Sequence, residues 1–247
     1  MKKSLKKVLL MVVAAFALVL AGCQTSTPTD TEAGVVGEMA GQELEDIQQD
    51  NDEKEKVLVI DVRSKEEYDE GHVKHAINIP LDELEANLDR LEDYKDEPVI
   101  TVCNTGNKSE EAAQILIDNE FTDVTNAEGV KDFEGYDLVQ FESILIDETE
   151  EAIADYNAGE EIIFVDARDQ EDFETSAFPG AISADPENAD AVLAELPEDK
   201  DVRIVNYCYS GTRSAVVADA IADAGYTNVQ NALYGTKEYE DYELEEK

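Results

Sequence analysis

The sequence is poor in cysteine and in basic residues. Three of its 247 residues are cysteines, Cys23, Cys103 and Cys208, which is too few for a disulfide scaffold. Lysine and arginine number 19 against 60 aspartates and glutamates, so the formal net charge is −41. A surface this acidic repels nucleic acids and anionic membranes, which argues against both as partners.

One apolar run, Val8–Leu20, is short for a membrane-spanning helix, which needs about 20 apolar residues. Its lysine-rich start is typical of a secretory signal, and its end, Leu20-Ala21-Gly22-Cys23, resembles the bacterial lipobox. We therefore expect a lipoprotein signal peptide over 1–22, a lipid on Cys23, a flexible tether over 23–35 and anchoring at the outer face of the cell membrane through that lipid alone. A plain signal peptide or an uncleaved anchor are the alternatives.

The acidity predicts a dependence on salt. Removal of residues 1–22 takes away four lysines and no acid, and shifts the formal net charge from −41 to −45. Such a charge destabilises the compact state unless counterions screen it. One hypothesis is that the protein works in a saline medium; the alternative is a well-solvated acidic surface.

The chain contains an internal repeat. Shifted by 105 residues, Val57–Ala127 aligns with Ile162–Ala232 without a gap, and 19 of the 71 positions are identical. A period of this length is the size of a domain rather than of a solenoid unit. We infer a tandem duplication.

Each copy alternates short apolar runs with helical patterns. Residues 57–60 and 99–102, and their counterparts 162–165 and 203–207, are typical of buried parallel strands. Ser109–Glu120 and Ser214–Gly225 are predicted helices, each beginning at a capping serine. We predict two α/β domains, over 36–144 and 145–247, each a small parallel sheet with helices on both faces.

A cysteine loop follows the last of these strands in each copy. The loops read Cys103-Asn-Thr-Gly-Asn-Lys-Ser109 and Cys208-Tyr-Ser-Gly-Thr-Arg-Ser214. Such a loop, closing on a helix N-terminus, can aim backbone N–H groups at one point, which binds anions and favours a nucleophilic thiolate. Arg213 would offer a fixed fork to an oxyanion, and Lys108 a more mobile charge. We expect Ser109 and Ser214 to cap the helices rather than bind the anion.

These motifs resemble the rhodanese family. The shared features are Asp61-Val62-Arg63, Gly71-His72, Ala76-Ile77-Asn78-Ile79-Pro80 and the loop Cys208–Ser214. The resemblance implies a sulfurtransferase without metal or organic cofactor, in which a cysteine persulfide carries sulfur from a donor anion such as thiosulfate to cyanide or a thiol. It implies catalytic roles for Cys208 and Cys103, and substrate binding by Lys108, Arg213, Tyr209, Ser210, Gly211, Thr212, Ser214, Gly106 and Ser109.

Loop length argues against a cysteine phosphatase, the nearest alternative enzyme. Related phosphatases and arsenate reductases have five residues between cysteine and arginine. Here four residues separate Cys208 from Arg213 and Cys103 from Lys108. The tighter ring should be cramped for a tetrahedral phosphate.

The two copies match the family unequally. The second loop fits at every defining position, whereas the first has Lys108 in place of arginine; upstream, only the first copy keeps Gly71-His72. A module that binds a partner or senses sulfur or redox state without turnover is therefore a second hypothesis, and an acidic spacer with relic sites is a third. A Cys103–Cys208 disulfide is not expected, because each thiol should lie in its own domain's pocket.

Several further polar residues are assigned structural roles. We expect Asp61, Arg63, Asp166 and Arg168 to form a charge network beneath the loops, and His72 to be structural. Tyr234, Tyr239 and Tyr242 are interpreted as packing or rim residues. The sequence indicates neither the oligomeric state nor the physiological sulfur donor.

Overall fold

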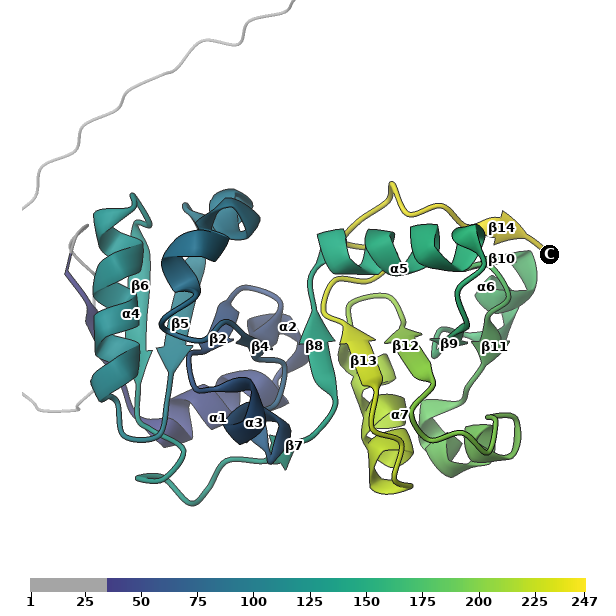
Figure 1. The fold of residues 1–247 in the computed structure, drawn as a ribbon, viewed down its shortest axis with the longest axis horizontal. Helices are drawn as coiled ribbons and strands as arrows, with labels where there is room; N and C mark the ends of the chain where they lie inside the picture. Colours follow the sequence, from purple (N-terminus) through teal and green to yellow (C-terminus); the bar gives the residue numbers. More distant parts are fainter. Residues whose placement is uncertain (1–34) are drawn as a thin grey trace, which may run out of the picture. The chain divides into compact units, whose positions relative to one another are not determined.

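The computed structural model describes residues 35–247 (Figure 1). The predicted signal peptide, Cys23 and all but the last residue of the predicted tether lie outside the described residues. The described residues cluster as one compact unit. Among the described residues, no helix has the length and apolar character needed to cross a bilayer.

The first repeat forms a five-stranded sheet in which all neighbouring strands are parallel. Its strand order is β1-β6-β5-β2-β4. The strands are β1 (Gly37–Met39), β2 (Leu58–Asp61), β4 (Ile77–Asn78), β5 (Pro98–Val102) and β6 (Asp123–Ala127).

Helices cover both faces of this sheet, because the central strands are apolar on both sides. On one face, Leu58 and Ile60 of β2 pack with residues of α4 and η1; on the other, Val59 packs with Leu44 of α1. The helices are α1 (Gly41–Gln49), α2 (Asn51–Lys54), α3 (Lys65–Asp69), the 3-10 helix η1 (Leu84–Tyr94) and α4 (Asn107–Asp118).

The second repeat builds the same sheet, in the order β11-β9-β12-β13-β8 and again all parallel. Ile204 of β12 packs with residues of α7 and η2, and its neighbour Val205 packs with residues of α5. The strands are β8 (Glu142–Ile144), β9 (Ile162–Asp166), β11 (Ile182–Ser183), β12 (Arg203–Tyr207) and β13 (Val229–Ala232). The helices are α5 (Ile146–Ala158), α6 (Gln170–Thr175), η2 (Pro186–Ala194) and α7 (Thr212–Asp223).

Two short antiparallel pairs complete the secondary structure of the described residues. β3 (His72–Val73) pairs with β7 (Leu138–Val139), and β10 (Ser176–Ala177) pairs with β14 (Glu245–Glu246). β8 belongs to the second sheet, which therefore begins three residues before the predicted boundary at Leu145.

The prediction of two tandem α/β domains is confirmed, and the elements that carry the cysteine loops repeat in register. β5 and β12 have bounds that differ by 105 residues at both ends, and so do α4 and α7. The strand, loop and helix around each cysteine therefore have equal length in the two domains.

The expectation that serines begin these helices is wrong. α4 and α7 start two residues earlier, at Asn107 and Thr212, and their N-cap residues are Gly106 and Gly211, which make no side-chain cap. Both glycines have positive φ, 81° and 77°, so the loop turns into the helix at the glycine. Ser109 and Ser214 then lie in the first helical turn.

The two domains contact each other within the compact unit. The Arg90 guanidinium lies 2.8 Å from the Glu148 carboxylate, and the rings of Tyr94 and Tyr234 are 5.8 Å apart between centroids. Leu233, which follows β13, packs into the core cluster of the first domain. The residues after β13 thus contact both domains.

Candidate active site

The first loop holds the Cys103 sulfur at the start of α4. Cys103 follows β5 directly and is 2% exposed. Its Sγ lies 3.4 Å from the backbone nitrogen and 3.3 Å from the hydroxyl oxygen of Ser109. Ser109 is fully buried, and its Oγ also lies 2.6 Å from Oδ1 of Asn126 on β6.

These donors favour the thiolate of Cys103. Burial by itself raises the pKa of the Cys103 thiol, but the Ser109 hydroxyl and the backbone N–H groups of Thr105, Ser109 and Lys108 together outweigh it and lower that pKa. The predicted ring of donors around an anionic sulfur is thus present in the first loop.

The second loop places Cys208 at the equivalent position, with a serine hydroxyl beside its sulfur. Cys208 follows β12, is 1% exposed, and has its Sγ 3.4 Å from the Ser214 hydroxyl, which also lies 3.2 Å from the Gly211 carbonyl oxygen. A Cβ on Gly211 would lie 2.5 Å from the Leu233 carbonyl oxygen, so only glycine fits. Thr212 Oγ1 is buried without a hydrogen-bond partner in the described part of the chain.

Both thiols are more buried than their loop position suggests. Each belongs to the apolar cluster of its domain, and both are free. A reagent can therefore reach each sulfur only through the small surface that the surrounding atoms leave exposed.

The predicted anion-binding cations differ between the domains. Arg213 Nη1 lies 2.7 Å from Oδ1 of Asp169, so the guanidinium fork is partly engaged by a carboxylate. Lys108 instead lines a cavity of about 650 Å³ together with Ser64, Glu85 and Glu111. The first-domain cation thus lies in a mixed-charge recess.

A polar contact links each loop to the first helix after the Asp-x-Arg segment. Asn104 Nδ2 donates to Glu67 of α3 at 2.7 Å, and the Tyr209 hydroxyl donates to Asp172 of α6. Both partners of the second contact lie 105 residues after those of the first. We call these two contacts the loop braces. Tyr209, predicted to bind substrate, is thus held from within its own domain.

Two glycines that the sequence analysis missed support the loops from behind. A Cβ on Gly129 would lie 2.3 Å from the Asn104 carbonyl oxygen, and one on Gly235 would lie 2.3 Å from the Cys208 carbonyl oxygen. The residue after Gly235 donates its backbone N–H to that oxygen at 3.0 Å. The signal in the sequence was a glycine two or three residues after the Asn-Ala that ends each of β6 and β13.

The predicted charge network beneath the loops is confirmed as two buried ion pairs. Arg63 Nη2 lies 2.6 Å from Asp61 and also donates to the Gly71 carbonyl. Arg168 Nη2 lies 2.7 Å from Asp166. Because both pairs also fix neighbouring backbone, they position the strand ends beside the cysteines.

His72 and the C-terminal tyrosines have packing roles, as predicted. His72 is fully buried and stacks on Tyr68 with 3.5 Å between ring centroids; burial lowers its pKa to about 3. Tyr242 packs edge-on against Phe178 and Tyr239.

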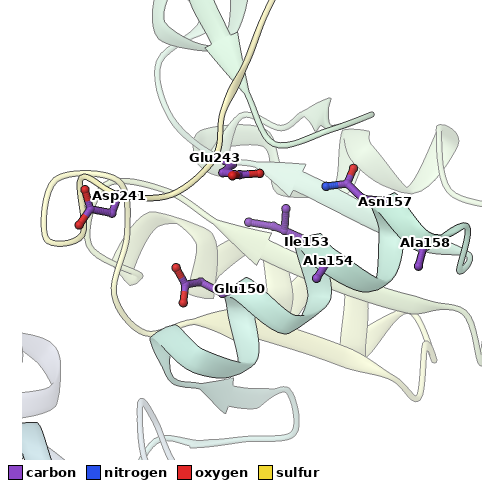
Figure 2. Close-up of a pocket in the computed structure, with 7 residues that line it drawn as sticks. All are labelled: Glu150, Ile153, Ala154, Asn157, Ala158, Asp241 and Glu243. Carbon is purple, nitrogen blue, oxygen red and sulfur yellow. The ribbon is translucent and has the colours of Figure 1, made fainter.

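The cavity in Figure 2 lies away from both thiols. It has a volume of about 620 Å³ between α5 and the C-terminal segment, where Glu150 faces Asp241 and Glu243. In residues 35–247, no group of three or more histidine, cysteine or acidic side chains is arranged to hold a metal ion.

Comparison with known families bears on these loops. A profile of the rhodanese-like domain matches residues 42–134 and again 147–242. The chain belongs to the rhodanese-like family. Its two rhodanese-like domains each contain one of the cysteine loops described above.

Relatives of the two rhodanese-like domains have more than one function. The chain is 42% identical over 73 residues to the thiosulfate sulfurtransferase PspE of Escherichia coli (strain K12), covering 30% of this chain and 70% of that protein. It is 33% identical over 76 residues to a tRNA uridine(34) hydroxylase of Cronobacter sakazakii, covering 29% of this chain and 22% of that enzyme. A thiosulfate sulfurtransferase structure from Pseudomonas aeruginosa matches at 23% identity with a TM-score of 0.37, over 85% of this chain and 44% of that one. At the level of the family, a sulfurtransferase-type function is supported.

Proposed function

We propose that this protein is a sulfurtransferase whose second domain carries sulfane sulfur as a persulfide on Cys208. The observation that carries the proposal is the position of the Cys208 sulfur, at the end of the central strand β12 and 3.4 Å from the Ser214 hydroxyl. The unpartnered Thr212 hydroxyl and the nearby Arg213 supply further donors for an anion. No comparable set of donors is needed for a cysteine that only fills a core.

The reaction has two balanced steps. The Cys208 thiolate attacks the sulfane sulfur of thiosulfate, forming an S–S bond to the cysteine as sulfite leaves with the electron pair of the broken bond. An acceptor nucleophile then attacks the outer sulfur of the persulfide, and the S–S bond breaks to restore the Cys208 thiolate. When the acceptor is cyanide, the product is thiocyanate. The loop donors stabilise the negative charge on the terminal sulfur between the steps.

Cys103 is proposed as a second carrier with a different substrate preference. Its thiolate is stabilised by four donors, but its cation is Lys108, which cannot grip an oxyanion with two parallel bonds. The recess beside Lys108 also contains carboxylates, which disfavour a doubly charged anion. We expect Cys103 to take up sulfur from thiosulfate more slowly than Cys208.

The test is mass spectrometry of cysteine peptides after incubation of the protein with thiosulfate. A gain of one sulfur atom on the Cys208 peptide, removed by cyanide and absent from Cys208→Ser, is expected. Repeated release of thiocyanate identifies an enzyme. One modification per thiol without turnover favours a sensing or partner-binding module, and no gain in the folded protein contradicts the proposal.

We further propose that the protein is exported and held at the outer face of the cell membrane by a lipid on Cys23. Support comes from the order of basic residues, apolar run and Leu20-Ala21-Gly22-Cys23 in the sequence. Metabolic labelling with a fatty acid tests it, and Cys23→Ser should abolish the label. Labelling that survives this substitution contradicts the anchor.

A further inference from the structure

A lysine of the first domain reaches the catalytic loop of the second. Lys54, the last residue of α2, is 4% exposed. Its Nζ lies 2.5 Å from the carbonyl oxygen of Ser210 and 3.3 Å from that of Leu233. Ser210 lies two residues after Cys208, inside the loop, so one side chain connects the domains at the proposed site.

The two carbonyls that Lys54 binds lie on the two segments that shape the loop. Ser210 precedes the turn at Gly211, and the Leu233 carbonyl is the group that a Cβ on Gly211 would strike at 2.5 Å. An ammonium that donates to both oxygens holds these segments together. It thereby fixes the turn at Gly211, which leads from Cys208 into α7.

The charged surroundings of Lys54 are mixed. Burial lowers the pKa of the Lys54 ammonium, whereas the carboxylates of Glu238 and Glu55 and the Cys208 sulfur act to raise it. His75 is a neighbour on the first-domain side, and it is buried without a hydrogen-bond partner in the described part of the chain. On the second-domain side, the Arg213 guanidinium is a second cation that interacts electrostatically with Cys208. Lys54 is thus a buried cation near a thiol, with acids and a histidine around it.

In residues 35–247, no lysine or arginine of the second domain makes the equivalent contact with the Cys103 loop. The residue 105 positions after Lys54 is Gly159, the left-handed C-cap of α5. The second domain therefore offers no equivalent cation to the Cys103 loop. The first domain thus supports the Cys208 loop through Lys54, and the second domain has no equivalent residue that supports the Cys103 loop.

We propose that Lys54 is a positioning residue through which the first domain holds the Cys208 loop in its sulfur-accepting shape and stabilises negative charge on that sulfur. This proposal rests on the proposed function only where it concerns the effect of Lys54 on sulfur transfer. Its physical content is the ionisation of Cys208, which can be measured without any sulfur donor.

The test compares the pH dependence of alkylation of each cysteine in the full chain, followed by peptide mass spectrometry. Lys54→Met should move the midpoint of the Cys208 profile to higher pH; a shift of one pH unit lowers the thiolate fraction roughly tenfold at neutral pH. The Cys103 peptide of the same sample is an internal control and should not shift. Lys54→Arg keeps the charge, so it should restore part of the Cys208 alkylation rate that Lys54→Met loses at neutral pH.

A matched control is Lys56→Met, since Lys56 is exposed and pairs only with Glu53 of its own helix region at 2.6 Å. It should leave both profiles unchanged. If Lys54→Met does not fold, Lys54→Gln, which keeps N–H donors and removes the charge, gives the same comparison. An unshifted Cys208 profile in a folded Lys54→Met or Lys54→Gln variant overturns the proposal.

The two proposals fail separately. If wild-type protein gains no sulfur from thiosulfate but Lys54→Met shifts the Cys208 profile, sulfur transfer is wrong and the role of Lys54 stands. If sulfur transfer is observed and the profile does not move, the role of Lys54 alone is wrong.

Discussion

Arg213 and Asp169 form an ion pair across the mouth of the second loop, with 2.7 Å between Nη1 and Oδ1. Asp169 precedes α6, and the equivalent residue in the first domain is Ser64, which instead caps α3 through its hydroxyl. Arg213 is about one-third exposed and Asp169 about two-thirds, so solvent screens the pair. An anion that binds Arg213 would therefore have to compete with this carboxylate.

Asp169→Ser, which copies the first domain, should strengthen thiosulfate binding. It frees the guanidinium and removes a negative charge, and at a solvated site such a charge changes binding by roughly 1 kcal/mol, or about fivefold. Steady-state kinetics should show a lower KM for thiosulfate with little change in kcat. Glu198→Ser, which removes an exposed acid elsewhere, serves as the control. A higher KM would mean that Asp169 holds Arg213 in its binding position.

Cys103 should react as a thiolate below the pH range of an ordinary thiol. Its donors lower its pKa, so the thiolate persists to lower pH and alkylation of Cys103 should keep its rate there. Ser109→Ala removes the hydroxyl 3.3 Å from the sulfur and should move the midpoint of the profile to higher pH. Thr122→Ala, which removes an exposed hydroxyl that donates to the Lys95 carbonyl away from the loop, is the control. An unshifted profile in Ser109→Ala would mean that the backbone N–H groups alone lower the pKa of the Cys103 thiol.

Gly235→Ala should damage the second loop more than an ordinary glycine substitution. The added Cβ would lie 2.3 Å from the Cys208 carbonyl oxygen, and overpacking of this kind costs about 1–3 kcal/mol. The free energy of unfolding measured in urea and the uptake of sulfur on Cys208 should both fall. Gly225→Ala strains a positive φ of 89° but meets open space, so it should lower stability and leave sulfur uptake intact. Equal losses of uptake in the two variants would contradict the supporting role of Gly235.

Stability and turnover should both rise with salt. With 60 acidic and 19 basic residues the folded chain repels itself and repels thiosulfate, and salt shortens the range of both repulsions to about 3 Å at 1 M. Thermal unfolding should show a higher Tm in high salt, and kcat/KM for thiosulfate should rise from low to moderate salt. A Tm that is flat or falls with salt would remove the hypothesis of a saline habitat.

The local features of the fold could be predicted because each of their sequence patterns occurs in both repeats. The apolar runs of β5 and β12 and the loops after them fixed the sheet, its parallel direction and the position of both thiols. The starts of α4 and α7 do not follow from the capping preference of serine, because the chain turns into each helix at a glycine of positive φ three residues earlier.

Contacts between segments distant in the chain could not be predicted from one sequence. Lys54 lies in an acidic, polar stretch that resembles a solvated helix, and nothing local indicates that its ammonium is buried against Ser210. The pairing of Arg213 with Asp169 likewise depends on how closely α6 approaches the loop. Burial of both thiols follows from packing of the helices, which residue patterns do not specify.

The loop braces limit how the two domains can be recombined. Asn104 with Glu67 and Tyr209 with Asp172 occupy equivalent positions, yet an amide has been exchanged for a phenol and a glutamate for an aspartate. The longer side chain on one partner contacts the shorter one on the other, so the two side chains of each brace are matched in length. A chimera that receives the Cys208 loop in the first domain would set a phenol against the longer glutamate, and would need Glu67→Asp to seat the transplanted segment.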